Sequence, residues 1–387
     1  MAPGPTAETA PAQDDRAADT PAADTPAADP ADADAATLLA PHTTLGLGGP
    51  ARRLVHATTA DEVVARARAA DGAGEPLLLV GGGSNLVVGD AGFAGTVLLI
   101  DTRGHHVVAR DADSVVLHVE AGHDWDALVA DTVAAGYGGL ECLSGIPGRT
   151  GATPVQNVGA YGVEVADVLV DVDLYGRRTG RRGVVPAADL GLGYRTSRLK
   201  GDRNVDGEVV LGVRFRLTTD GLSAPVRYGE LARALGVEPG TRVPVAEARE
   251  AVLRLRRGKG MVTDPDDPDS RSAGSFFTNP VVDRATADRV AARAEAAGQV
   301  PVTAWPMPDG RVKLSAAALI ERAGVSRGHP GPQAPVRVST KHTLALTHRG
   351  GGTTDDLLAL ARDVRDRVDA AFGLVLEPEP VLVSCTL

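Results

Sequence analysis

The sequence predicts an α+β protein, and three of its features lead to that prediction. Short β-rich runs and amphipathic helical segments are interspersed along the chain without regular alternation of strand and helix. Hydrophobic residues make up 43% of the 387 residues, enough for a sizeable core. Residues 1–40 differ because they repeat Ala, Asp, Pro and Thr, a composition too poor in apolar surface to fold. We therefore predict a disordered tail over 1–40, followed by folded domains.

The first predicted domain covers residues 41–218 and combines helices with strands. A helix over Thr59–Ala70 begins at a threonine that can cap it, and its apolar residues recur at helical spacing. A second helix is predicted at Trp125–Ala135. Short apolar or alternating runs predict strands at Pro76–Val80, Leu86–Val88, Thr96–Ile100, Val115–Val119, Val165–Leu174 and Val209–Leu217.

A connection over residues 219–259 and a second α+β domain over 260–383 complete the predicted organisation. The connection holds a short helix at Val245–Arg256. In the second domain Thr353, followed by two aspartates, marks the start of the helix Thr354–Phe372, since acidic residues in a first turn favour the helix dipole. Two further helices and one strand are predicted at Asp283–Ala297, Leu314–Ala323 and Thr343–Thr347.

The composition argues against several classes of function. A net charge of -10 does not favour nonspecific nucleic-acid binding, which needs a basic face. The two cysteines, Cys142 and Cys385, are too few for a disulfide framework and indicate a reducing, cytoplasmic compartment. No apolar run reaches about 18 residues and no secretory signal is evident, so we expect no membrane span. The nine histidines show no Cys/His cluster at metal-ligand spacing, so no metal site is predicted. The sequence also implies no obligatory protein partner.

A glycine-rich run, Gly81–Asn85 (GGGSN), follows an apolar strand. Its backbone N–H groups and its serine hydroxyl can converge on an anion such as a pyrophosphate, although many such runs are only tight turns. Another run, Gly46–Ala51, formally matches the dinucleotide-binding fingerprint. Pro50 and an arginine pair follow it and no βαβ unit does, so we reject a Rossmann site there.

A second glycine-rich run covers Ser144–Gly162. Small residues recur in it every two to four positions, and Pro147 and Pro154 each remove a backbone donor. A loop this long inside a compact domain is usually functional or disordered, and its apolar and tyrosine content argues against disorder. Small residues also let the backbone approach a flat ring or a phosphate closely. The run therefore favours ligand binding.

Six motifs follow one another along the chain. They are HTTLGLGG (42–49), VGGGSNLVV (80–88), SGIPGRTGATPVQNVGAYGVE (144–164), GYRTS (193–197), AGSFFTNP (273–280) and LEPE (376–379). Together they resemble the UDP-N-acetylenolpyruvoylglucosamine reductase family of peptidoglycan precursor synthesis, over about residues 41–383. Arg227–Glu230 (RYGE) resembles the variant with an extra substrate loop. The resemblance implies an FAD-binding domain of the vanillyl-alcohol-oxidase type and a smaller α+β substrate-binding domain.

The resemblance also implies a cofactor and two substrates. FAD would be bound non-covalently, NADPH would reduce it and leave, and UDP-N-acetylglucosamine enolpyruvate would then occupy the same region. This order needs no Rossmann fingerprint. The first glycine run would hold the FAD pyrophosphate and the second would line the flavin. The cofactor-binding residues implied are Gly81, Gly82, Gly83, Ser84, Asn85, Ile146, Pro147, Gly148, Gly151 and Gly159.

Reduction of an enolpyruvyl ether requires three groups, because hydride adds to the methylene and negative charge then spreads into the carboxylate. Arg195 matches the family's arginine, whose planar fork suits a carboxylate. Ser275, followed by two phenylalanines, matches the family's proton donor. Glu379 matches the acidic partner, with Glu377 as its rival, and must be neutral beside a carboxylate, so we expect a raised pKa. The ordinary uses of these residues are a solvated arginine, a capping serine and a surface carboxylate.

Substrate-binding residues also follow from the resemblance, at Tyr161, Tyr228, Lys259 and Asn279. The lysine suits a diphosphate and the tyrosines suit the uridine diphosphate, although half-buried packing is their ordinary use. Arg254, Arg256 and Arg257 lie near Lys259 in the sequence and leave the diphosphate ligand open. We do not place Lys313 in the pocket.

Two other functions remain open. A flavin-dependent alcohol oxidase or dehydrogenase could share the FAD domain, but it would leave the GSFFTNP and LEPE motifs unexplained. A non-catalytic flavin-binding protein would have no need of Arg195, Ser275 and Glu379 together.

Overall fold

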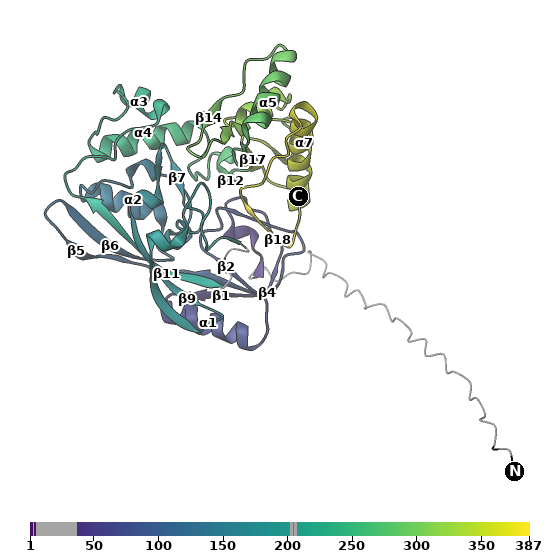
Figure 1. Ribbon diagram of the computed structural model, residues 1–387. Coiled ribbons are helices and arrows are strands. Elements are labelled where there is room, and N and C mark those ends of the chain that lie inside the picture. The colour runs from purple at the N-terminus through teal and green to yellow at the C-terminus, as the bar shows by residue number, and fades with distance from the viewer. Residues whose placement is uncertain (3, 5–36, 202–203, 205–206) are drawn as a thin grey trace.

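The computed structural model describes residues 1–2, 4, 37–201, 204 and 207–387 (Figure 1). Most of the tail predicted over 1–40 lies outside these residues. Leu39, however, is only 2% exposed and belongs to a core cluster with Val88 and Val97. The packed structure therefore begins before residue 41, because the apolar pair that ends the repetitive segment has a core to bury it.

The first sheet is parallel, with strand order β1-β4-β2. Its elements are β1 (Ala51–Ala57), α1 (Ala60–Gly72), β2 (Leu77–Val80) and β4 (Phe93–Ile100). Thr59 caps α1 as predicted, by accepting a hydrogen bond from the N–H of Glu62. Strand β1 was not predicted, because its central residues are mostly exposed and two of them are arginines. A β–α–β crossover therefore exists, but the glycines at 46–49 precede β1, so the Rossmann geometry is still absent here.

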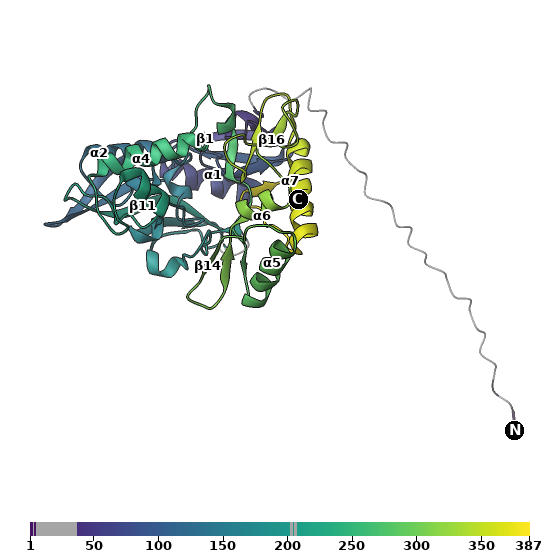
Figure 2. The same cartoon turned by 90° about the horizontal axis from the view of Figure 1, so that it is seen from above.

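The second sheet is antiparallel, with strand order β10-β9-β11-β6-β5. Its strands are β5 (His105–Arg110), β6 (Ser114–Glu120), β9 (Leu169–Gly176), β10 (Arg181–Pro186) and β11 (Glu208–Thr218). Three helices lie on the same side of it (Figures 1 and 2), namely α2 (Trp125–Ala134), α3 (Gly229–Leu235) and α4 (Val245–Gly258). They share one hydrophobic cluster with the sheet, in which Trp125 meets Phe215 edge to face.

The C-terminal part contains two small antiparallel sheets covered by helices. One sheet has the order β12-β17-β16 and the other β13-β15-β14. The elements are β12 (Ser272–Ser275), β13 (Val281–Val282), α5 (Arg284–Ala296), β14 (Ala304–Pro306), β15 (Val312–Leu314), α6 (Ala316–Arg322), β16 (Val336–Val338), β17 (Ala345–His348) and α7 (Thr354–Phe372). Thr353 and Asp356 form a capping box at the start of α7.

The chain end returns to the N-terminal part (Figure 1). Strand β18 (Val381–Val383) pairs in parallel with β3 (Leu86–Val88), directly after the first glycine run. A two-residue hairpin of β7 (Gly159–Ala160) and β8 (Val163–Glu164) closes the second glycine run. Both glycine runs and the LEPE motif are thereby brought to one place.

The predicted helices agree with the structure to within two residues at each end. The predicted start of one strand at Val165 is wrong, since a 3-10 helix occupies Val165–Asp167 and β9 begins at Leu169. The α+β class is confirmed, and the helices described by the structure include none that is long and apolar enough to cross a bilayer.

Candidate active site

A cavity of about 350 Å³ lies where the glycine runs, the GYRTS turn and the C-terminal part meet. Most of the predicted cofactor-binding residues and all three predicted catalytic residues line it. These residues are Gly81, Gly82, Gly83, Ser84, Asn85, Ile146, Pro147, Gly148, Gly159, Arg195, Ser275 and Glu379.

The two glycine runs pack directly against each other. A Cβ built on Gly82 would lie 2.7 Å from the Cα of Gly148, and one on Gly148 would lie 2.8 Å from the hydroxyl of Ser84. Gly83 has φ +59°, and a Cβ there would lie 1.9 Å from the carbonyl oxygen of His42. These positions need glycine because the backbones approach closely, whether or not a phosphate is bound.

Two of the predicted flavin-lining glycines differ in their surroundings. Gly151 packs on Ala121, whose Cβ would lie 2.6 Å from a Cβ at that position, and it does not line the cavity. Gly159 does line it, and its carbonyl oxygen accepts a hydrogen bond from Arg195 at 3.0 Å. Packing therefore explains the glycine at position 151, because the loop must close on the end of β6.

Three arginines of the cavity wall carry a buried Nε that lacks a hydrogen-bond partner, namely Arg149, Arg195 and Arg256. An unsatisfied buried donor is costly, and a guanidinium is best satisfied by a carboxylate or a phosphate. Arg149 is also held from the other side by Asp124, at 3.1 Å. The wall therefore fits an anionic group such as the diphosphate of FAD or a sugar-linked carboxylate.

Arg195 sits at the tip of a tight turn. Gly193 and Thr196 exchange backbone hydrogen bonds, and Arg195 between them has φ 53°, a left-handed conformation that is uncommon for a residue with a side chain. Its Nε lies 2.8 Å from Oε1 of Glu379. The N–H does not point along that line, which is why the atom still lacks a hydrogen bond although the ion pair is close.

Ser275 is the last residue of β12 and faces the cavity. The pairing of β12 with β17 shifts register between Ser272 and Ser275, and Gly274 inside this bulge has φ +74°. A bulge of this kind re-aims the side chain that follows it. Phe276 and Phe277, each 1% exposed, fix the backbone beyond the serine.

Glu379 reaches the cavity because the LEPE segment forms an isolated antiparallel bridge, between Pro378 and Phe277, with the residues that follow Ser275. The N–H of Glu379 donates to the carbonyl of Phe276 at 2.9 Å, and the side chain is 12% exposed, whereas Glu377 is exposed to solvent. Burial raises the pKa of Glu379 from its usual value, against the opposing effect of Arg195 and then of Lys200. The expected raised pKa is therefore supported, and Glu379 rather than Glu377 faces the cavity.

Three of the four predicted substrate-binding residues form a second group beside the cavity. The rings of Tyr161 and Tyr228 meet edge to face at 5.6 Å, and Nζ of Lys259 lies 5.8 Å from the centre of the Tyr161 ring. Lys259 also pairs with Glu230 at 2.6 Å. Burial, the largest effect, raises the pKa of Tyr161 to about 12, and the nearby Arg256 opposes it. None of the three lines the cavity itself.

Asn279 lies elsewhere, in the segment between β12 and β13. Its side-chain Oδ1 accepts the N–H of Ala316, the first residue of α6, and it is hydrogen-bonded to Tyr194, the residue before Arg195. Lys313 also approaches this tyrosine, with its Nζ 4.9 Å from the ring centre. Asn279 therefore supports the arginine turn, and Lys313 lies nearer to the site than we expected.

The sequence left the choice among three arginines open and missed other residues of the site. Arg256, rather than the more exposed Arg254 or Arg257, lines the cavity, as does Lys200. Asn157, 1% exposed with φ 46°, holds the arginine turn by donating to the carbonyl of Gly193 at 3.2 Å. Only tertiary contacts distinguish these residues, because one arginine in a run of three, or one asparagine in a loop, carries no local signal.

Comparison with known proteins gives the family. Residues 266–383 match the family model described as "UDP-N-acetylenolpyruvoylglucosamine reductase, C-terminal domain", and residues 51–181 match that of an FAD binding domain. A protein from Saccharopolyspora erythraea named UDP-N-acetylenolpyruvoylglucosamine reductase is 61% identical over 351 residues, 90% of this chain and 95% of its own length. One of the same name from Salinispora arenicola is 57% identical over 350 residues, again 90% and 95% of the two chains.

A solved structure gives the same result. The crystal structure of UDP-N-acetylenolpyruvylglucosamine reductase from Thermus caldophilus is 26% identical, with a TM-score of 0.56 over 89% of this chain and 97% of that one. These matches extend over the glycine runs, the arginine turn and the C-terminal segment that together build the cavity. The chain belongs to the UDP-N-acetylenolpyruvoylglucosamine reductase family.

Proposed function

We propose that the protein is an FAD-dependent enzyme that uses NADPH to reduce UDP-N-acetylglucosamine enolpyruvate to UDP-N-acetylmuramate in peptidoglycan precursor synthesis. The observation that carries this proposal is the meeting of Arg195, Ser275 and Glu379 on a cavity walled by two glycine runs. The names of the relatives support the same reaction.

The wall of the cavity fits FAD. Gly81–Asn85 and Ile146–Gly148 form a glycine cradle with room for backbone approach, and Arg149 and Arg256 offer unsatisfied donors to the diphosphate. When bound, FAD supplies the hydride that it receives from NADPH. No histidine, cysteine or tyrosine is needed as a covalent tether in this arrangement, so we propose non-covalent binding.

The three catalytic residues each meet one need of the second half-reaction. Arg195 binds the enolpyruvyl carboxylate through its guanidinium and stabilises the charge that spreads into it. Once hydride has added to the methylene carbon, the π electron pair moves to the adjacent carbon. Ser275 gives its Oγ proton to that carbon and recovers one from water, and Glu379, protonated, donates a hydrogen bond to the enolate oxygen.

The second group of residues suits the nucleotide end of the substrate. Lys259 is a point-charge donor for a diphosphate, and the two tyrosine rings of Tyr161 and Tyr228 offer apolar faces and hydroxyls beside it. Because Tyr228 and Glu230 come from the RYGE segment, the extra substrate loop contributes directly to this region. We place the reaction in the reducing cytoplasm, which the two unpaired cysteines support.

The test separates the two half-reactions. The bound flavin is reduced anaerobically with NADPH, and UDP-N-acetylglucosamine enolpyruvate is then added in a stopped-flow spectrometer. We expect the flavin to be reoxidised; if its colour does not return, the proposed activity is wrong. Acid precipitation that leaves flavin attached to the protein would instead favour a covalent flavin oxidase.

A variant tests the proton donor. Ser275→Ala should slow reoxidation by the sugar by about 100-fold to 10,000-fold and leave reduction by NADPH nearly unchanged. The control is Thr278→Ala, which removes a hydroxyl three residues along the same segment that donates to Glu377 outside the cavity. Equal losses in both half-reactions would assign Ser275 a structural role.

A further inference from the structure

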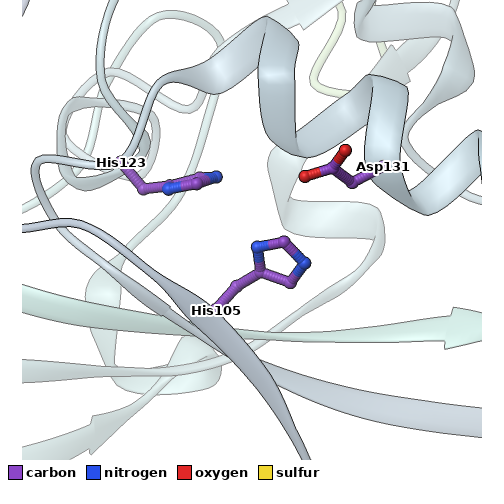
Figure 3. Close-up of side chains that lie close together, drawn as sticks. All are labelled: His105, His123 and Asp131. Atoms are coloured by element: carbon purple, nitrogen blue, oxygen red, sulfur yellow. The ribbon is translucent and has the colours of Figure 1, made fainter.

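Two histidines and an aspartate lie close together away from the active-site cavity (Figure 3). One ligand atom each from His105, His123 and Asp131 lie within 4.8 Å of one another. The two imidazole rings are 5.2 Å apart, and the aspartate side chain points toward them (Figure 3). Imidazole nitrogens with a carboxylate oxygen are ligands that Zn²⁺ prefers.

Three elements bring these side chains together, which is why their spacing in the sequence gave no signal. His105 opens β5 and pairs with Val119 of β6, His123 follows the end of β6, and Asp131 lies on the second turn of α2. The N–H of Glu120 donates to the carbonyl of Gly104 at 3.0 Å, so the strand ends that carry the histidines are held together. The backbone therefore fixes two of the three groups.

His123 offers an unsatisfied nitrogen to this cluster. Its Nε2 is buried without a hydrogen-bond partner, and its Nδ1 is 3.3 Å from the N–H of Gly104. The nearby Arg103 is paired with Asp101 at 3.1 Å, which offsets its charge beside the cluster.

We propose that His105, His123 and Asp131 bind a divalent transition-metal ion of the Zn²⁺ class, with water completing its coordination. In a tetrahedral zinc site the ligand atoms are about 3.4 Å apart, so a cluster whose ligand atoms lie within 4.8 Å must contract by up to roughly 1.4 Å. The exposed Asp131 side chain is free to move inward from the helix surface. Binding at Nε2 also moves the ring proton of His123 to Nδ1 and gives up the long contact with Gly104, so we expect micromolar rather than nanomolar affinity.

The site would brace the loop that lines the flavin cavity. The carbonyl of His123 accepts the N–H of Thr150 at 2.9 Å, and the next residue, Asp124, pairs with Arg149. A metal ion would tie β5 and α2 to this loop without lining the cavity itself. Its role is structural, and it is independent of the proposed reaction.

Calorimetric titration of the untagged, EDTA-treated flavoprotein with Zn²⁺ tests the site. We expect one equivalent to bind and the melting temperature to rise with it. Loss of an outer-shell partner of a metal already costs 10–100-fold in affinity. His105→Ala and Asp131→Asn, which remove a half-buried and an exposed ligand, should therefore each weaken binding by at least about tenfold.

The matched control is His106→Ala. His106 is the next residue on β5, and its ring lies 5.2 Å from that of His118, the same ring separation as in the proposed site. Glu120 lies 3.6 Å from His118, but among the described residues no third ligand atom lies within 4.8 Å of both histidines. This variant should bind Zn²⁺ as the unaltered protein does. The proposal is overturned if the protein takes up no Zn²⁺ in the micromolar range, or if His106→Ala weakens binding as much as His105→Ala.

Discussion

Replacing Arg195 by glutamine should destabilise the protein more at high pH than at low pH. The guanidinium lies 2.8 Å from the carboxylate of Glu379, with side-chain exposures of 23% and 12%. Without Arg195, one of the groups that lowers the pKa of Glu379 is lost, and the already raised pKa rises further. When the pKa of a carboxyl group is higher in the folded state than in the unfolded state, its contribution to stability is fully present at a pH below the unfolded pKa. That contribution is lost as the pH rises through the folded pKa.

The magnitude follows from these contacts. Breaking a buried ion pair on one side costs about 3–5 kcal/mol, and the residual exposure of both partners places R195Q near the lower end, about 3 kcal/mol at pH 8. Between the unfolded and folded pKa values of Glu379 the stability changes by at most about 1.4 kcal/mol per pH unit. At pH 5 we expect R195Q to destabilise the protein by about 1 kcal/mol, because the hydrogen bond to Gly159 and the contact with the Tyr194 ring are lost.

Urea denaturation followed by tryptophan fluorescence and circular dichroism measures these differences at both pH values. The double variant R195Q/E379Q removes the unpaired carboxylate and should regain about 2 kcal/mol at pH 8. Equal destabilisation by R195Q at the two pH values would refute the reasoning, and so would a double variant no more stable than R195Q. Either result would mean that the charge of Glu379 is not what Arg195 offsets.

Three further predictions concern residues that hold the site or the core in place. Gly83→Ala should cost about 3–5 kcal/mol in urea denaturation, because a Cβ would meet a carbonyl oxygen at 1.9 Å, whereas Gly72→Ala, with nothing within 4 Å, should change stability by less than about 1 kcal/mol. Asn157→Ala should cost about 2–4 kcal/mol and raise the KM for the enolpyruvyl sugar in steady-state assays, since it frees the turn that carries Arg195. Leu39→Ala should cost about 2–4 kcal/mol, and a thermal melt unchanged by it would show that residues before 41 do not contribute to the core.

The sequence predicted the long helices best, because their signals are local. The threonines at the starts of α1 and α7 cap those helices as expected, and the apolar spacing set the lengths. Strands whose residues are exposed on one or both faces were missed. The second and third residues of β1 are exposed arginines, and β5 is an edge strand with mostly exposed residues, so neither shows the buried alternation that identifies a strand.

The candidate site was predicted from motif order rather than from geometry. That order located Arg195, Ser275 and Glu379, which the fold brings to one cavity from three distant segments. It could not show that Gly151 serves packing, or that Asn279 supports the arginine turn instead of lining the cavity. Such distinctions depend on what lies opposite each residue after folding, and a single sequence does not record that.

The Arg195–Glu379 pair also bears on how one cavity serves both half-reactions. Before the sugar binds, the buried carboxylate of Glu379 offsets the charge of Arg195. Arrival of the substrate carboxylate places two anions at one guanidinium. Their repulsion adds to the burial that already raises the pKa of Glu379, and it favours uptake of a proton by that residue. In the mechanism that we propose, the substrate itself thereby converts Glu379 from a counter-ion into the hydrogen-bond donor that assists protonation by Ser275.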